Sequence, residues 1–161
     1  MIFADVRGST AIAENAGPAE FAALLNRFYG VAMDALLPRN AHIDKMIGDE
    51  VMAFFIPALH GEPQKAAMKG GTEILRGVGY GSGKEPWLPV GIGINFGEAY
   101  VGKVGTVNTA ARLQAHAKAG EVVVSESVYS YIDSQYPGVQ LEDLEVRGRE
   151  ETFGVHVIRP V

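Results

Sequence analysis

The chain has 161 residues, 47% of them hydrophobic, and a formal net charge of −5. This size and composition are typical of one soluble globular domain, and we expect residues 1–161 to form it. The acidic balance argues against a nucleic-acid partner bound through a broad basic surface, and no apolar run reaches the ~20 residues of a membrane span. The absence of cysteine excludes disulfides and thiolate metal sites, and it fits a cytoplasmic location.

The first part of the chain predicts a buried strand followed by two helices. Residues 1–6 form the strand, and Ser9 or Thr10 can cap a helix over 11–16. Pro18 then opens a longer helix, in which apolar residues recur at the spacing of one buried face. These residues are Phe21, Leu24, Leu25, Phe28, Val31, Ala32 and Ala35.

The rest of the chain predicts hairpins alternating with helices. Strands over 42–46 and 51–56 are joined by a tight turn at Gly48-Asp49. The further helices are expected over 62–76, 107–118 and 126–134, and the further strands over 90–95, 98–104, 121–125 and within 141–161. This order indicates an α+β fold, with a ferredoxin-like β-α-β-β-α-β core, helices packed on an antiparallel sheet, and additional strands extending it.

Two aspartates stand where ligands of a hard metal ion can occur. Asp5 ends the first strand, just before a helix N-terminus whose backbone amides can hold phosphate oxygens. Asp49 lies on the turn of the first hairpin. Each aspartate alone is better explained by a turn or capping role. If the two strands are neighbours, however, both carboxylates face one cavity, as a pair of Mg²⁺ or Mn²⁺ ions requires.

Three further polar residues are candidates for binding a ligand. Lys45 lies on the strand that leads into the turn, where a solvated edge lysine is the simpler interpretation. Asn108 and Arg112 are four residues apart, so they share one face of their predicted helix. That face can be an ordinary solvated surface. Equally, the amide in the first turn can reach a ligand, and the guanidinium suits a phosphate.

Four segments together resemble the catalytic domain of class III adenylate and guanylate cyclases, most closely the bacterial adenylate cyclases. They follow the order of that family and cover nearly the whole chain. The segments are residues 3–10 (FADVRGST), 44–54 (DKMIGDEVMAF), 90–102 (VGIGINFGEAYVG) and 106–113 (TVNTAARL).

The resemblance implies a role for each motif residue in making cyclic AMP from ATP. Asp5 and Asp49, with the backbone carbonyl of Val6, would bind two divalent cations, Mg²⁺ or Mn²⁺. The turn after Asp5 would contact phosphate; its residues are Gly8, Ser9 and Thr10.

The remaining roles concern the nucleotide. Lys45 would recognise the purine, Asn108 would hold the ribose, and Arg112 would stabilise charge on the α-phosphate. Arg147 falls where the family often has a lysine that contacts the triphosphate. A lysine at position 45 favours ATP, because guanylate cyclases commonly have glutamate there.

The resemblance also implies a homodimer with two shared sites. One chain would supply Asp5, Lys45 and Asp49, and the other Asn108 and Arg112. We expect a regulatory domain elsewhere in a longer parent protein, because a strand follows Met1 directly. The alternatives are a guanylate cyclase, a cyclase-fold domain that binds nucleotide without turnover, and a phospho-acceptor signalling domain. The last would need alternating β-α units, which the two hairpins argue against.

The sequence departs from the family between Gly105 and Thr106. Members carry a hairpin arm here, and its returning strand holds a second purine-selecting residue. Either the arm is deleted in this protein, which would leave base selection to Lys45, or the printed sequence passes over it. We favour the second explanation, because the motifs on both sides are intact.

Overall fold

The structure is a computed structural model that describes residues 1–59, 61–97, 107–145 and 152–160. Its strands are β1 (Ile2–Val6), β2 (His42–Ile47), β3 (Glu50–Phe54), β4 (Val90–Ile94), β5 (Val122–Ser125), β6 (Leu141–Glu145) and β7 (Thr152–Ile158). Its helices are α1 (Ser9–Ala16), α2 (Pro18–Leu36), α3 (Pro63–Gly77), α4 (Val107–His116) and α5 (Glu126–Tyr129), with 3-10 turns at Leu37–Arg39 and Pro57–Leu59.

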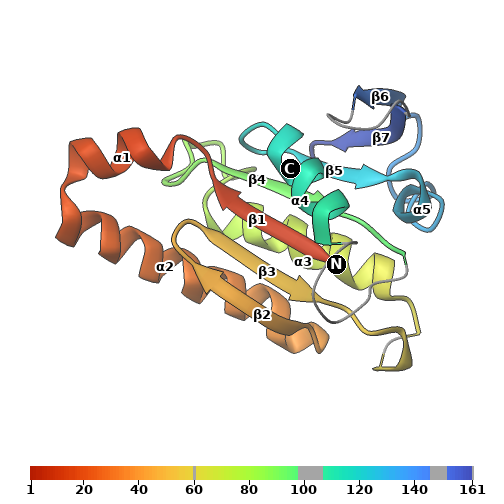
Figure 1. Cartoon of the computed structure of the whole chain (residues 1–161), viewed down its shortest axis with the longest axis horizontal. Coiled ribbons are helices and arrows are strands. Elements are labelled where there is room, and N and C mark those ends of the chain that lie inside the picture. Colours follow the sequence, from red (N-terminus) through yellow and green to blue (C-terminus); the bar gives the residue numbers. More distant parts are fainter. Residues whose placement is uncertain (60, 98–106, 146–151, 161) are drawn as a thin grey trace.

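The strands form one sheet in the order β2-β3-β1-β4-β5-β7-β6 (Figure 1). The first four strands in this order pair antiparallel, and β1 lies between β3 and β4. This is the ferredoxin-like arrangement, and it confirms the α+β fold expected from the sequence. The parallel pair β4–β5 joins this core to β7 and β6, which extend the sheet.

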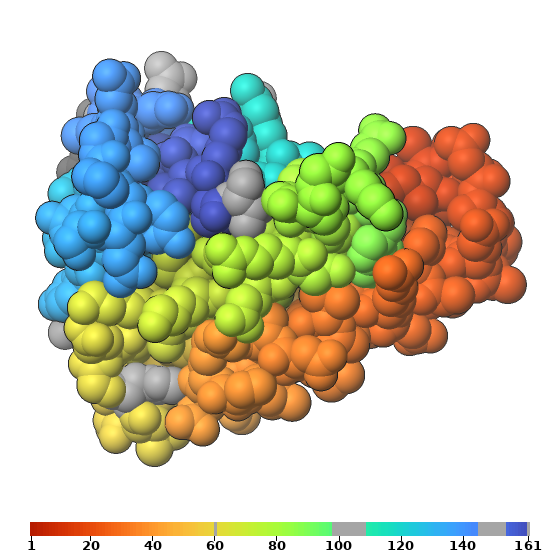
Figure 2. Space-filling model, turned by 180° about the vertical axis from the view of Figure 1, so that it is seen from behind, coloured from red at the N-terminus to blue at the C-terminus, as the bar shows by residue number. Residues whose placement is uncertain are grey.

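The two faces of the sheet are covered by different helices. Successive residues of a strand point to opposite faces, so Ile2, Ala4 and Val6 share one face of β1. These residues belong to the large core beneath α2 and α3, which also contains Phe28 and Leu36. Seen from behind, α2 and α3 lie side by side over this face (Figure 2).

Among the described helices, α4 is the one that packs across the centre of the opposite face (Figure 1). Phe3 and Met52, which are paired across β1 and β3, pack there against Ala110 of α4. The glycines of β4 allow this close approach, because a Cβ on Gly93 would lie 2.1 Å from the backbone nitrogen of Gln114. The helix backbone therefore rests directly on the strand.

The structure corrects the start and end of several predicted elements. Neither Ser9 nor Thr10 caps α1: the helix begins at Ser9, and its N-cap is Gly8 with φ of 68° and no side-chain capping bond. The helix predicted over 126–134 ends at Tyr129. The strand predicted over 98–104 lies outside the described residues. In the part of the chain described, no helix is long and apolar enough to cross a membrane.

Candidate active site

The carboxyl end of β1 and the β2–β3 turn lie next to each other. Asp5 is paired with Glu50, the first residue of β3. The backbone N–H of Val6 donates a hydrogen bond of 3.1 Å to the carbonyl oxygen of Asp49. The tip of the first hairpin is thus joined to the end of the central strand, so the carboxylates of Asp5 and Asp49 belong to one polar region.

Two side chains hold the turn in this place. The hydroxyl of Ser9 donates a hydrogen bond to Oδ2 of Asp49. The Tyr29 hydroxyl, from α2, donates a hydrogen bond of 2.5 Å to the carbonyl oxygen of Gly48. Gly48 has φ of 61°, a conformation that glycine adopts without steric cost. Neither contact is evident from the sequence alone, because its partners are 40 and 19 positions apart along the chain.

A pocket of about 560 Å³ opens beside this turn. It is lined by Ser9, Thr10, Ala13, Glu14, Phe21, Gly48 and Asp49. The pocket borders the first turn of α1, where backbone N–H groups have no partner within the helix. It therefore combines two carboxylates, two hydroxyls and a helix N-terminus, which is a setting suited to phosphate oxygens accompanied by cations.

Asp5 lies in a crowded electrostatic environment. Burial, together with the charges of Asp49 and Glu50, raises the pKa of its carboxyl to about 6. Arg7, at 3.2 Å from Oδ2, and a hydrogen bond from the Gln114 side chain act in the opposite direction on the pKa. Burial and Asp49 also raise the pKa of Glu50. The carboxyl groups of Asp5, Asp49 and Glu50 thus lie close enough to repel one another, and Arg7 and Lys45 offset only part of this repulsion.

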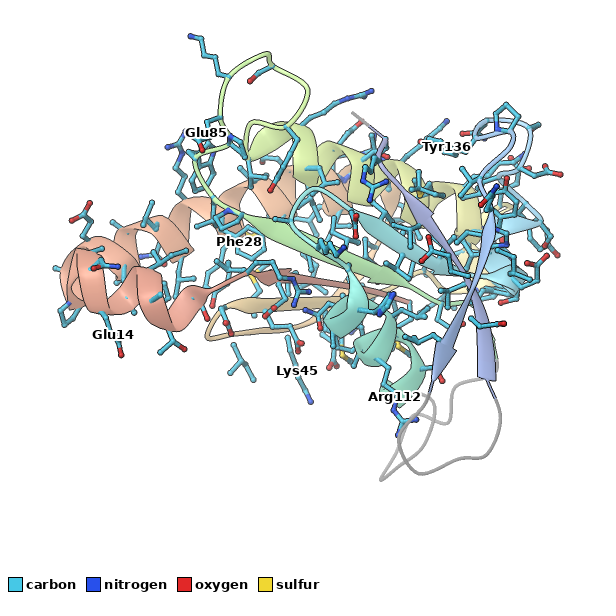
Figure 3. All side chains as sticks on the ribbon, turned by 90° about the horizontal axis from the view of Figure 1, so that it is seen from above. Glu14, Phe28, Lys45, Glu85, Arg112 and Tyr136 are labelled. Carbon is cyan, nitrogen blue, oxygen red and sulfur yellow. The ribbon has the colours of Figure 1, made fainter. Side chains whose placement is uncertain are left out.

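Lys45 lies on the same face of the sheet as Asp5. It is paired with Met52, which packs against Ala110 of α4. The positive charge of Lys45 lowers the pKa of Glu50. The side chains of Lys45 and Arg112 point to the same side of the molecule, away from α2 and α3 (Figure 3). Both side chains are exposed.

The helix predicted to carry Asn108 and Arg112 is present as α4. Asn108 lies in its first turn, and its side chain lies outside the described part. Arg112 is exposed, while its neighbours Ala110 and Leu113 are buried against the sheet. Arg147 and the junction between Gly105 and Thr106 also lie outside the described residues.

The donor set at the turn fits Mg²⁺ or Mn²⁺. Among the described residues, no group of three or more His, Cys, Asp and Glu side chains could enclose a metal ion. Asp5 and Asp49 offer two carboxylates, whose mutual repulsion a cation would relieve. Mg²⁺ is usually held by one or two carboxylates together with substrate phosphates and water, so two carboxylates beside this pocket are sufficient.

The family model described as "Adenylate and Guanylate cyclase catalytic domain" matches residues 1–159. The chain belongs to this family. A protein named adenylate cyclase from Anabaena cylindrica is 28% identical over 183 aligned residues, covering 99% of this chain and 36% of that protein. The chain spans about a third of the length of this protein and of two other curated relatives that it matches.

Solved structures of cyclase domains share the fold. The adenylyl cyclase CyaB from P. aeruginosa superposes with a TM-score of 0.77 at 26% identity, covering 98% of this chain and 91% of that one. The guanylyl cyclase Cya2 gives a TM-score of 0.81 at 23% identity, covering 97% and 88%. Both adenylyl and guanylyl cyclases thus have this architecture, and the family alone does not decide the base.

Proposed function

We propose that the chain is an adenylate cyclase domain that converts ATP to 3′,5′-cyclic AMP and pyrophosphate. The observation that carries the proposal is the junction of the β1 end with the β2–β3 turn, where Asp5 and Asp49 meet beside a pocket lined by Ser9 and Thr10. In a member of the cyclase family, this is a suitable place for a nucleoside triphosphate and two divalent cations.

The chain's own groups would position the nucleotide for attack of the ribose 3′-hydroxyl on the α-phosphorus. Asp5, Asp49 and the Val6 carbonyl would hold the cations, which supply Lewis acidity at the phosphates and a lower pKa for the 3′-hydroxyl. The turn after Asp5, formed by Gly8, Ser9 and Thr10, would contact phosphate. Such reactions depend mainly on positioning and electrostatics, because the protein forms no covalent bond to the substrate.

Arg112 and Asn108 would act on the nucleotide from a second copy of the chain. Arg112 is exposed on α4 and, among the described residues, has no ion-pair partner. A free guanidinium can therefore approach an α-phosphate bound to a partner, while Asn108 in the first turn holds the ribose. A homodimer would contain two equivalent sites. Arg147 would contact the triphosphate.

Lys45 supports ATP as the substrate. It is exposed beside the proposed site, and the adenylate cyclases of the family have lysine where guanylate cyclases commonly have glutamate. A cation can accompany a hydrogen bond to an acceptor on adenine. The similarity to an adenylate cyclase over 99% of the chain agrees with this choice. A guanylate cyclase and a nucleotide-binding domain without turnover are the alternatives.

The wider setting that we propose follows from the same assignment. Residues 1–161 would be one catalytic domain of a longer cytoplasmic protein that carries a regulatory domain. The relatives are about three times longer than this chain, which leaves room for such a domain in the parent protein.

The test is cyclic nucleotide production from ATP and from GTP, each with Mn²⁺ and with Mg²⁺, across a range of protein concentrations. We expect cyclic AMP, with a specific activity that rises with concentration as dimers form. Asp49→Ala should remove nearly all of the activity, and Arg76→Gln, an exposed substitution on α3, should retain it. Preference for GTP would overturn only the choice of base. A dimer that forms no product would favour the binding-domain alternative.

A further inference from the structure

Arg7 makes contacts that the proposed mechanism does not use. It lies within the first motif, two residues after Asp5. Its Nη1 is 3.2 Å from Oδ2 of Asp5, and its Nη2 donates a hydrogen bond of 2.5 Å to the backbone carbonyl of Gln114 in α4. The guanidinium thus bridges the end of β1 and a helix 107 positions away in the sequence.

The path of this side chain is built into the sheet. Arg7 crosses Gly91 of β4, which is paired with Asp5, and a Cβ on Gly91 would lie 2.4 Å from Nε of Arg7. Nε is buried without a hydrogen-bond partner among the described residues. An unsatisfied buried donor is unfavourable for folding, so the stability of the fold alone does not account for an arginine here.

α4 is a firm anchor for this bridge. Its backbone rests on β4 at Gly93, and Ala110 and Leu113 are buried beneath it. The side chain of Gln114 also hydrogen-bonds the Asp5 carboxyl. The Asp5 carboxyl is therefore held by two side chains. Gln114 belongs to α4, and Arg7 is itself hydrogen-bonded to the α4 backbone.

We propose that Arg7 is a positioning residue, which fixes the Asp5 carboxylate against α4 in the orientation that the proposed metal site requires. This inference rests on the proposed function, because it concerns the ligand that would bind the cations there. Lysine cannot replace arginine in this role. It carries the same charge but lacks the planar fork that reaches Asp5 and the Gln114 carbonyl together.

The first experiment measures binding of Mn²⁺ alone, from the loss of the free-ion signal in electron paramagnetic resonance. In Arg7→Lys the charge near the site is unchanged, so any difference from wild type reports the lost geometry. We expect affinity to fall about tenfold, the lower end of the effect of removing a group that orients a metal ligand. An affinity equal to wild type would overturn the inference.

Arg39→Lys is the matched control. Arg39 also bridges a carboxylate and a backbone carbonyl, those of Glu73 and Ala35, but it does so at the other end of α2. It should lose a comparable part of the free energy of unfolding and retain wild-type Mn²⁺ affinity. Equal losses of affinity in the two variants would show a general effect on folding and would contradict a positioning role for Arg7.

A mixed dimer provides the second experiment. One chain carries Arg112→Ala and the other Asp49→Ala, so the single intact site takes its aspartates from the first chain and Arg112 from the second. With Arg7→Lys in the first chain, we expect kcat to fall about tenfold. The same substitution in the second chain disturbs folding equally, leaves the aspartates of the intact site untouched and can reach that site only through the α4 that carries Arg112, so we expect a smaller loss. Equal losses in both arrangements would overturn the inference.

The two proposals can fail separately. A wild-type chain that binds Mn²⁺ but forms no cyclic nucleotide would contradict the proposed function, and the Mn²⁺ comparison would still decide the role of Arg7. Conversely, a chain that forms cyclic AMP with Arg7→Lys at wild-type rate and affinity would retain the proposed function and exclude the positioning role.

Discussion

The two faces of the sheet differ in what they bury. The face under α2 and α3 holds the large core, in which Phe28 and Leu36 are fully buried. The face under α4 has only small apolar clusters, and at its edge Asp5, Glu50 and Lys45 are only partly buried or exposed. Because the side chains of each strand alternate between the faces, every strand of the core contributes to both.

This difference separates stability from the proposed activity. The α2–α3 face supplies the apolar burial that stabilises the fold. The α4 face places three carboxyl groups close together, two of them with raised pKa values, which is unfavourable for folding without a cation. Substitutions on the α2–α3 face should therefore lower the free energy of unfolding and spare activity, whereas substitutions of the carboxyl groups on the α4 face should lower activity and spare stability.

The largest contrast is expected between Asp49→Ala and Phe28→Ala. Asp49→Ala should lower cyclic nucleotide formation by a factor on the order of a thousand and leave the free energy of unfolding nearly unchanged, because the side chain lies at a turn beside solvent. Phe28→Ala should cost about 3–5 kcal/mol of that free energy, because it opens a cavity in the core. Its activity per folded molecule should stay near wild type. Urea unfolding and product assays on the same preparations measure both quantities.

The next contrast is between two glycines. Gly93→Ala places a Cβ 2.1 Å from the Gln114 backbone nitrogen and 2.5 Å from the Ala110 carbonyl, so α4 must move away from the sheet. We expect a loss of ~3 kcal/mol or more and loss of activity. Gly71→Ala, within α3, meets only side-chain carbons at 3.5 Å and should raise stability by about 0.5–1 kcal/mol. Equal melting temperatures for the two variants would contradict the direct contact between α4 and β4.

The third prediction concerns the pH dependence of stability without metal. The folded-state pKa of Asp5 is about 6, against 3.8 for its unfolded reference. The folded protein therefore binds this proton more tightly, and the contribution of Asp5 to stability should be full below pH 3.8 and lost as pH rises through 6. Asp5→Asn removes this dependence. It should raise the free energy of unfolding at pH 8 by about 1–2 kcal/mol and abolish activity.

Thermal melts at pH 5 and pH 8, with and without Mn²⁺, measure this effect. Mn²⁺ should stabilise the wild type more at pH 8, where Asp5 is charged, and should not stabilise Asp5→Asn at either pH. Glu142→Gln on β6, which is exposed, is a suitable control for the loss of one negative charge. A wild type that is more stable at pH 8 than Asp5→Asn in the absence of metal would contradict the raised pKa.

Much of the fold follows from local sequence patterns. The apolar spacing after Pro18 predicted α2, and Gly48-Asp49 predicted the turn between β2 and β3. Both signals depend on neighbouring residues alone. α5 was predicted too long: the residues after Tyr129 form turns in the structure, and Ser, Tyr, Ile and Asp at positions 130–134 are weak helix formers. The pairing of β1 with β3 could be stated only as a condition, since no local pattern fixes which strands are neighbours.

The contacts within the candidate site were less accessible to sequence reasoning. Capping rules favour Ser9 as an N-cap, but Gly8 takes the N-cap position and leaves the Ser9 hydroxyl free to donate to Asp49. Arg7 stood in a recognised motif without an assigned role, because its partners are Asp5 and a distant carbonyl. The alternation of glycines in β4 was the one available signal that a backbone passes closely over that strand.

The smallest effect is expected for Ser9→Ala. Asp49 would keep its charge and its place on the turn, since the Val6 N–H and the Tyr29 hydroxyl still hold the neighbouring backbone. The lost hydrogen bond would leave its carboxylate free to rotate, and kcat/KM for ATP should fall about threefold to tenfold, which corresponds to about 0.7–1.4 kcal/mol, the net contribution of one ordinary hydrogen bond. Ser130→Ala, an exposed serine after α5, is the matched control. A loss as large as that of Asp49→Ala would mean that Ser9 contacts the reacting groups itself, and no loss would mean that the turn alone orients Asp49.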